Sequence, residues 1–117
     1  MQILLVINNK EELKKCREYV TELYPNHEIM AFADSEAAAD YVQSHEVDVC
    51  FSDMLMSPVT GIALLKKIRV RNGKARVIFL AEDASFALEA WRVFANDFLL
   101  KPITKQKIMH AGFNLQN

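Results

Sequence analysis

"VCFSDMLMSPVTG", residues 49–61, contains the end of an apolar run, an aspartate and a loop-like segment that finishes at a glycine. The run begins at Val47 and is nearly continuous to Phe51, which is typical of a strand that is covered on both faces. We therefore predict a buried strand over residues 47–51, with Asp53 just beyond its carboxyl end. In open parallel α/β sheets, functional sites form at that end of the strands. Asp53 is thus the first candidate site residue.

The same alternation of a strand-length apolar run and a segment with helical periodicity extends along the whole chain. The other predicted strands cover residues 3–7, 28–32, 76–80 and 98–100. The predicted helices cover residues 10–24, 34–45, 61–73, 84–95 and 104–116. This order is typical of βαβ units, so we predict an α/β fold, a doubly wound five-stranded parallel sheet with helices on both faces. Residues 1–117 are expected to form a single domain, with the first, third and fourth strands most central.

The composition excludes several classes of protein. Of the 117 residues, 51% are hydrophobic and 25% charged, and the net charge is -1, which is typical of a globular chain rather than a disordered or nucleic-acid-coating one. No apolar run approaches the ~20 residues of a membrane span and no leader-like segment is present, so we expect a cytoplasmic protein without a membrane partner. Cys16 and Cys50 lack metal-ligand spacing and are expected to be reduced core residues. His27, His45 and His110 are dispersed along the chain and support no metal site.

The residues that follow the predicted strands form one cluster, because the carboxyl ends of parallel strands meet at the same edge of a sheet. The cluster has a single buried carboxylate, Asp53, with amides and an ammonium around it. Its members are Asn8 and Asn9 after the first strand, Asp53 after the third, Ala81 and Glu82 after the fourth, and Lys101 before Pro102 after the fifth.

These features together resemble a known family. The fivefold alternation and Asp53, with Met56 and Gly61 downstream, are similar to the receiver domain of two-component response regulators. "DFLLKPI", residues 97–103, completes the similarity at the fifth strand. Residues 86–103, "FALEAWRVFANDFLLKPI", are especially similar to receivers that precede LytTR-type DNA-binding domains, although the 117 residues contain no such domain. The resemblance covers nearly the whole chain and implies a flavodoxin-like fold of the receiver type.

The resemblance implies a role for each residue at the strand ends. In the family, the aspartate that matches Asp53 accepts a phosphoryl group, and the lysine that matches Lys101 pairs with the phosphoryl oxygens. A Thr or Ser that matches Ala81 hydrogen-bonds the phosphoryl group, and an aromatic residue that matches Phe98 reports the event on the surface of the fourth helix and fifth strand. The family also binds Mg²⁺ through two acidic residues after the first strand, the acceptor aspartate and a main-chain carbonyl that matches Leu55.

The sequence departs from the family after the first strand, where Asn8 and Asn9 replace the acidic pair. This alignment puts the apolar Cys16 and Val20 on the buried stripe of the first helix. A second alignment, in which Ile7 and Asn8 match the acidic pair, would put charged side chains on that stripe and is the weaker alternative. In either alignment the acidic pair is missing.

The loss of two carboxylates changes the electrostatics of the pocket. Three carboxylates repel each other and need a cation, whereas Asp53, two amides and Lys101 are together neutral. Because Mg²⁺ prefers anionic oxygen, we expect it to bind weakly at most, and we expect no other cofactor. Ala81 is an independent loss, since a methyl group cannot donate a hydrogen bond to a phosphoryl oxygen. The vestigial Mg²⁺ site would consist of Asn8, Asn9, Asp53 and Leu55.

Two roles for Asp53 remain open at the level of sequence. Either Asp53 is still phosphorylated, or it forms a partly buried ion pair with Lys101 that supports the fold. Pairing alone accounts for a buried aspartate beside a lysine, which favours the second role. The resemblance also implies a cis peptide bond between Lys101 and Pro102. Trp91 and Phe94 fit the core and an exposed partner surface equally well, and Phe98 is expected to be partly exposed.

We predict a receiver domain of two-component phosphorelay signal transduction that is degenerate in its chemistry and signals by protein–protein contact. The expected partner is a histidine kinase or another signalling protein. The family also allows a homodimer through the surface of the fourth helix, fifth strand and fifth helix, and direct nucleic-acid binding is not expected. The alternative is a conventional receiver, phosphorylated on Asp53, that controls a transcription-regulator output domain absent from this chain. A flavin- or nucleotide-binding enzyme is disfavoured, because residues 8–12, "NNKEE", lack the small residues of a phosphate-binding loop, and we expect no enzyme activity.

Overall fold

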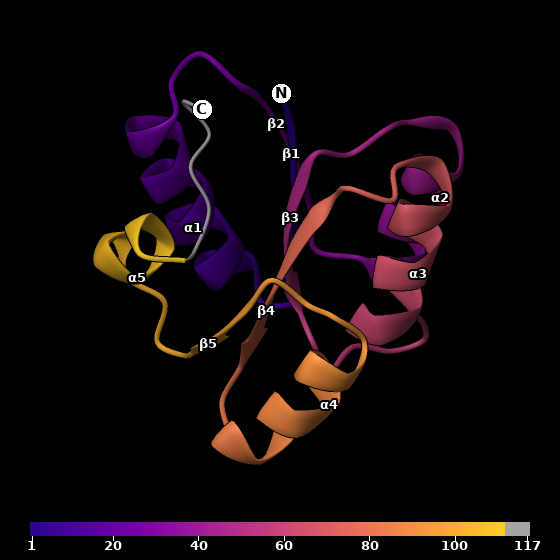
Figure 1. Cartoon of the computed structure of the whole chain (residues 1–117). Helices are drawn as coiled ribbons and strands as arrows, with labels where there is room; N and C mark the ends of the chain where they lie inside the picture. The colour runs from indigo at the N-terminus through magenta and orange to yellow at the C-terminus, as the bar shows by residue number, and fades with distance from the viewer. Residues whose placement is uncertain (112–117) are drawn as a thin grey trace.

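The computed structural model describes residues 1–111, which form a five-stranded parallel sheet covered by helices (Figure 1). The strands lie in the order β2-β1-β3-β4-β5, so β1, β3 and β4 are central, as predicted. Their bounds are Gln2–Val6 (β1), Glu28–Phe32 (β2), Val49–Asp53 (β3), Arg76–Ala81 (β4) and Asp97–Leu100 (β5). The chain changes direction across the sheet between β1 and β3, and ligands of doubly wound sheets bind at the carboxyl side of such a point. The predicted fold class is confirmed.

Helices lie on both faces of the sheet (Figure 1). α1 and α5 cover one face, while α2, α3 and α4 pack against the other. The helices are α1 (Lys10–Leu23), α2 (Ser35–Ser44), α3 (Gly61–Arg71), α4 (Ala87–Arg92) and α5 (Lys105–Met109). Four of them begin at a side chain that accepts a hydrogen bond from a main-chain N–H of the first turn, which is the usual way to start a helix. These caps are Asn9, Asp34, Thr60 and Thr104.

The third strand lies two residues beyond its predicted bounds of 47–51. Val47 is buried ahead of the strand, so its apolar character reflects the core and not the hydrogen-bonded ladder. Ser52 and Asp53 pair with Phe79 and Leu80 of β4 and therefore belong to β3. Asp53 is consequently the last residue of the strand and has a fixed main chain.

The last two predicted helices are shorter than expected. Residues 84–95 form a short 3₁₀ turn, Ala84–Phe86, followed by α4. The fifth predicted helix ends at Met109, because the Ala111 N–H bonds to the carbonyl of Ile108, an i→i−3 contact that tightens the last turn. The part of that prediction over residues 112–116 lies outside the described residues.

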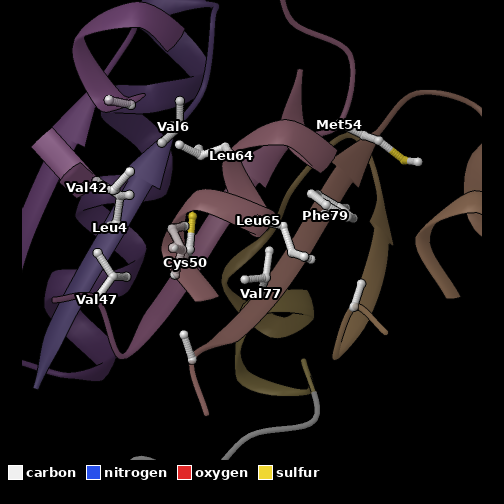
Figure 2. Packing of buried hydrophobic residues seen from close by; sticks show 14 of the residues in the cluster. Leu4, Val6, Val42, Val47, Cys50, Met54, Leu64, Leu65, Val77 and Phe79 are labelled. Carbon is white, nitrogen blue, oxygen red and sulfur yellow. The ribbon is translucent and has the colours of Figure 1, made fainter. Parts of the chain in front are cut away.

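Alternating side chains of the strands build two apolar layers, one on each face of the sheet. Leu4 and its neighbour Cys50 belong to the layer under α2 and α3, which Figure 2 shows from close by. The next pair, Leu5 and Phe51, belongs to the layer under α1 and α5. These strand residues are at most 1% exposed, which explains why the sequence shows nearly continuous apolar runs.

Both cysteines are free and buried, in agreement with the prediction. Burial, followed by the negative charge of Asp53, raises the pKa of the Cys16 thiol to about 12. Burial also raises the pKa of the Cys50 thiol. Both side chains therefore stay neutral and pack as small apolar groups.

Within residues 1–111, no helix has the length and apolar character needed to cross a membrane.

Candidate functional site

Asp53 is the last residue of β3 and belongs to the cluster of residues at the carboxyl ends of the strands. The residue is 4% exposed, and each oxygen of its carboxylate has a contact within the chain. Oδ2 accepts a hydrogen bond of 2.9 Å from the main-chain N–H of Asn8. Oδ1 lies 2.9 Å from Nζ of Lys101 and has no other partner among the described residues. The predicted ion pair between Asp53 and Lys101 is present.

Lys101 follows β5, and both its main chain and its side-chain ammonium are held by contacts within the chain. Its main-chain N–H donates to the carbonyl of Ala81, and its peptide bond to Pro102 is cis, as the resemblance implied. Its Nζ donates to Oε1 of Glu12 at 2.7 Å in addition to contacting Asp53. Burial alone would lower the pKa of Lys101, but the hydrogen bonds to Glu12 and Asp53 and the charges of both carboxylates outweigh it and raise this pKa above its ordinary value. Lys101 is therefore a stable cation at the centre of the cluster.

The two asparagines take part in the site through different atoms. The side chain of Asn9 caps α1, since its Oδ1 accepts hydrogen bonds of 2.9 and 3.0 Å from the N–H groups of Glu11 and Glu12. Asn8 acts through its main chain, which holds Asp53. Cys16, on the stripe that the preferred alignment of the first strand predicts to be buried, is 1% exposed.

A hollow of about 330 Å³ opens beside Asp53, between β3, β4 and the loop after β4. Ala81 is 5% exposed and lines this hollow, and Leu55 is 61% exposed at its edge. Phe98 lies elsewhere, half-buried on β5 and packed against the apolar layer of α2 and α3. The residues around the hollow are Asp53, Leu55, Leu80, Ala81, Glu82, Asp83, Phe86 and Lys101.

The donor atoms of this cluster do not fit the Mg²⁺ ion that the family implies. The oxygens of Asp53 already face an ammonium and an N–H group, and the Asn9 amide oxygen is occupied by the start of α1. Residues 1–111 contain no group of three acidic, histidine or cysteine side chains placed to hold a metal. A hard divalent cation needs several oxygens that are free to coordinate it.

Sequence reasoning did not find Glu12, Asp83 or Phe86 as members of the site. Glu12 stands three residues after the cap Asn9, in the spacing of a capping box, which predicts a contact with the main chain of the cap and not with Lys101. Asp83 and Phe86 carried no signal in the sequence, since they reach the hollow through the conformation of the loop after β4.

Comparison with known proteins identifies the family. The model of the response regulator receiver domain matches residues 3–112, and the chain belongs to this family. The chain is 29% identical over 98 residues to an uncharacterized response regulatory protein of Vibrio cholerae, covering 83% of this chain and 38% of that protein. It is 26% identical over 106 residues to the sensory transduction protein LytT of Enterococcus faecalis, covering 90% of this chain and 44% of LytT. The chain thus spans less than half the length of these two relatives.

Another relative is matched over nearly its full length. Protein CcdB of Bacillus subtilis is 31% identical over 113 residues, which cover 94% of this chain and 92% of CcdB. Among solved structures, the response regulatory domain of protein mrkE from Klebsiella pneumoniae superposes with a TM-score of 0.82 at 22% identity, covering 95% of this chain and 91% of that one. The likeness at this identity concerns the fold. The predicted resemblance to receivers, including those of LytT-type regulators, is confirmed.

Proposed function

We propose that this domain is a degenerate receiver, which takes part in two-component signalling by protein–protein contact and not by enzymatic turnover or phosphorylation of Asp53. The observation that carries the proposal is that both oxygens of Asp53 are engaged by donors of the chain itself, Asn8 and Lys101. The acidic pair that would hold Mg²⁺ is replaced by amides, and Ala81 offers no hydroxyl group to a phosphoryl oxygen. Two parts of the usual chemistry, the acidic metal ligands and the hydroxyl group at position 81, are thus missing independently of each other.

The surface of α4 and β5 is the proposed contact surface. Leu88 and Trp91 stand one helical turn apart on α4 and are 59% and 52% exposed, respectively. Phe94 follows the helix at 80% exposure, and Leu100 on β5 is 40% exposed. We call these four residues the α4-β5 patch. Exposed aromatic and aliphatic side chains on neighbouring elements are typical of protein contacts. A histidine kinase, another signalling protein or a second copy of the domain would bind here.

The alternative is a conventional receiver that is phosphorylated on Asp53 and controls an output domain. The length of the LytT relative supports it, because less than half of that protein is matched by this chain. Asp53 and Lys101 are also present at the strand ends where the family places them. The alternative therefore requires that phosphorylation occurs without the acidic pair that Asn8 and Asn9 replace.

Incubation with Mg²⁺ and acetyl phosphate separates the two functions. The proposal predicts no gain in mass at Asp53 by intact-protein mass spectrometry, because the metal that neutralises the phosphoryl oxygens is weakly bound. The matched variant Asn8→Asp/Asn9→Asp/Ala81→Thr restores the missing groups and should show the gain. A mass gain in the unmodified protein that Asp53→Asn abolishes would establish the alternative instead.

A further inference from the structure

Lys101 contacts a carboxylate that does not belong to any strand end. Its Nζ lies 2.7 Å from Oε1 of Glu12 and 2.9 Å from Oδ1 of Asp53. Glu12 lies in the first turn of α1, 89 positions earlier in the chain. The ammonium of Lys101 therefore bridges an acidic residue of α1 and one of β3.

The place of Glu12 follows from the way in which α1 begins. Asn9 is the cap and Glu12 is the third residue after it, a spacing at which an acidic side chain ordinarily turns back to the main-chain N–H of the cap. Here its carboxylate hydrogen-bonds Lys101 instead. The amino terminus of α1 favours the negative charge of Glu12 in either arrangement. Contact with Lys101 is thus the specific feature of this glutamate.

Two hollows meet at Lys101. The first, of about 400 Å³, lies between α1 and the segment after β5 and is lined by Glu12 and Lys101. The second, of about 330 Å³, is lined by Asp53 and Lys101. A lysine side chain has a flexible stem and three hydrogen-bond donors, so one carboxylate alone would leave the ammonium free to turn toward either hollow. Two carboxylates, one lining each hollow, fix the ammonium at the boundary between the two hollows.

We infer that Glu12 is a positioning residue for Lys101. It holds the ammonium on the side of α1 and makes it less available to an oxyanion that enters the hollow beside Asp53. This inference deepens the proposed function. The carboxylate of Glu12 pairs with the Lys101 ammonium, which a phosphoryl group on Asp53 would otherwise contact. The inference rests on the two contacts of Lys101 and does not require that Asp53 reacts.

The test compares Glu12→Gln with Glu11→Gln. Glu11 is the adjacent residue, has the same charge and is exposed in the same helical turn, so it controls for net charge and for the helix terminus. The first readout is ¹⁵N relaxation of the lysine ammonium groups. Lys101 should be rigid in the unmodified protein and in Glu11→Gln, and measurably more mobile in Glu12→Gln, where its ion pair with Asp53 remains but the contact with α1 is weakened. Glu12→Asp, which is one methylene too short for the contact, should behave like Glu12→Gln.

The second readout is titration with inorganic phosphate, followed through the Lys101 signals. Glu12→Gln should bind phosphate about two- to fivefold more tightly, the factor expected for removing a competing, partly exposed ion pair. Glu11→Gln should not differ from the unmodified protein. Equal effects of the two variants, or a Lys101 that stays rigid in Glu12→Gln, would overturn the inference. Phosphorylation of unmodified Asp53 by acetyl phosphate would instead overturn the proposed function and leave the Glu12 contact standing.

Discussion

Asn9 closes the amino terminus of α1 with its side chain, whereas Asn8 gives its main-chain N–H to Asp53. In the sequence the two amides stand together as replacements of an acidic pair, and the structure gives them different contacts. An aspartate at position 9 could cap the helix as well as asparagine does. The cap therefore does not explain why the acid is absent, and the reduced negative charge beside Asp53 remains its main consequence.

The different tasks of the asparagines predict different effects of truncation. Asn9→Ala removes the acceptor for two helix N–H groups and should lower the free energy of unfolding by about 1 kcal/mol. Asn8→Ala keeps the main-chain N–H that holds Asp53 and should change the free energy of unfolding by no more than about 0.5 kcal/mol. Urea unfolding of both variants measures the difference. Equal losses would show that Asn9 does not act as a cap in solution.

At the scale of the elements, the loop between β3 and α3 is held close to the site by Gly61. A Cβ atom built on Gly61 would lie 2.5 Å from the carbonyl oxygen of Asp53 and 2.9 Å from Cα of Met54. Both neighbours are main-chain atoms and cannot turn aside as a side chain would. The start of α3 and the end of β3 can therefore be this close only when residue 61 has no side chain.

Gly61→Ala should consequently move main chain at the site and destabilise the fold by about 1–3 kcal/mol, the cost of forcing an extra methyl group into a packed interior. Gly73, just beyond α3, is the matched control, because a Cβ there would meet nothing closer than 4.0 Å. Gly73→Ala should change the stability by less than about 1 kcal/mol. Thermal unfolding of the two variants checks the prediction, and equal shifts of Tm would contradict it.

The bounds of the strands were predictable from the sequence wherever a run of apolar residues coincides with the hydrogen-bonded part of the strand. β1, β2, β4 and β5 each coincide with a run of mainly apolar residues, so their bounds were predicted to within one residue. β3 was misplaced by two residues because Val47 is apolar for packing, while Ser52 and Asp53 are polar and yet lie in the ladder. The Asp53–Lys101 pair followed from the common edge of the parallel strands. The contact of Glu12 with Lys101 did not follow from the sequence. Glu12 lies on α1, and only the direction of its side chain brings it to the edge of the sheet.

At the scale of the whole molecule, the two apolar layers satisfy both faces of the sheet and leave the α4-β5 patch uncovered. The sequence left the environment of Trp91 and Phe94 open, and both are exposed. Phe94 also has a positive φ of 59°, a conformation in which a bulky residue is unusual and a glycine is favoured. A large aromatic side chain thus stands at a position where its main-chain conformation is unfavourable and its ring contributes little to the core.

The conformation of Phe94 predicts opposite effects of one substitution on folding and on association. Phe94→Gly relieves the unfavourable main-chain conformation and should raise the free energy of unfolding of the isolated domain by about 0.5–1 kcal/mol, since removing αL strain outweighs the added flexibility of the unfolded chain. If the α4-β5 patch joins two copies, the same change removes an aromatic anchor and should raise the dimer Kd about tenfold or more. Sedimentation equilibrium measures the Kd, and the fluorescence of Trp91, the chain's one tryptophan, follows both processes.

Val70→Ser is the control for this pair of measurements, because Val70 is 86% exposed on α3, outside the patch. It should leave both the unfolding free energy and the Kd nearly unchanged. An unmodified domain that stays monomeric at every concentration would exclude the homodimer, and the exposed aromatic side chains would then have to serve a different protein. A Phe94→Gly domain that is less stable than the original would show that the ring supports the monomer. In that case the positive φ would be compensated by packing within one domain and would carry no information about a partner.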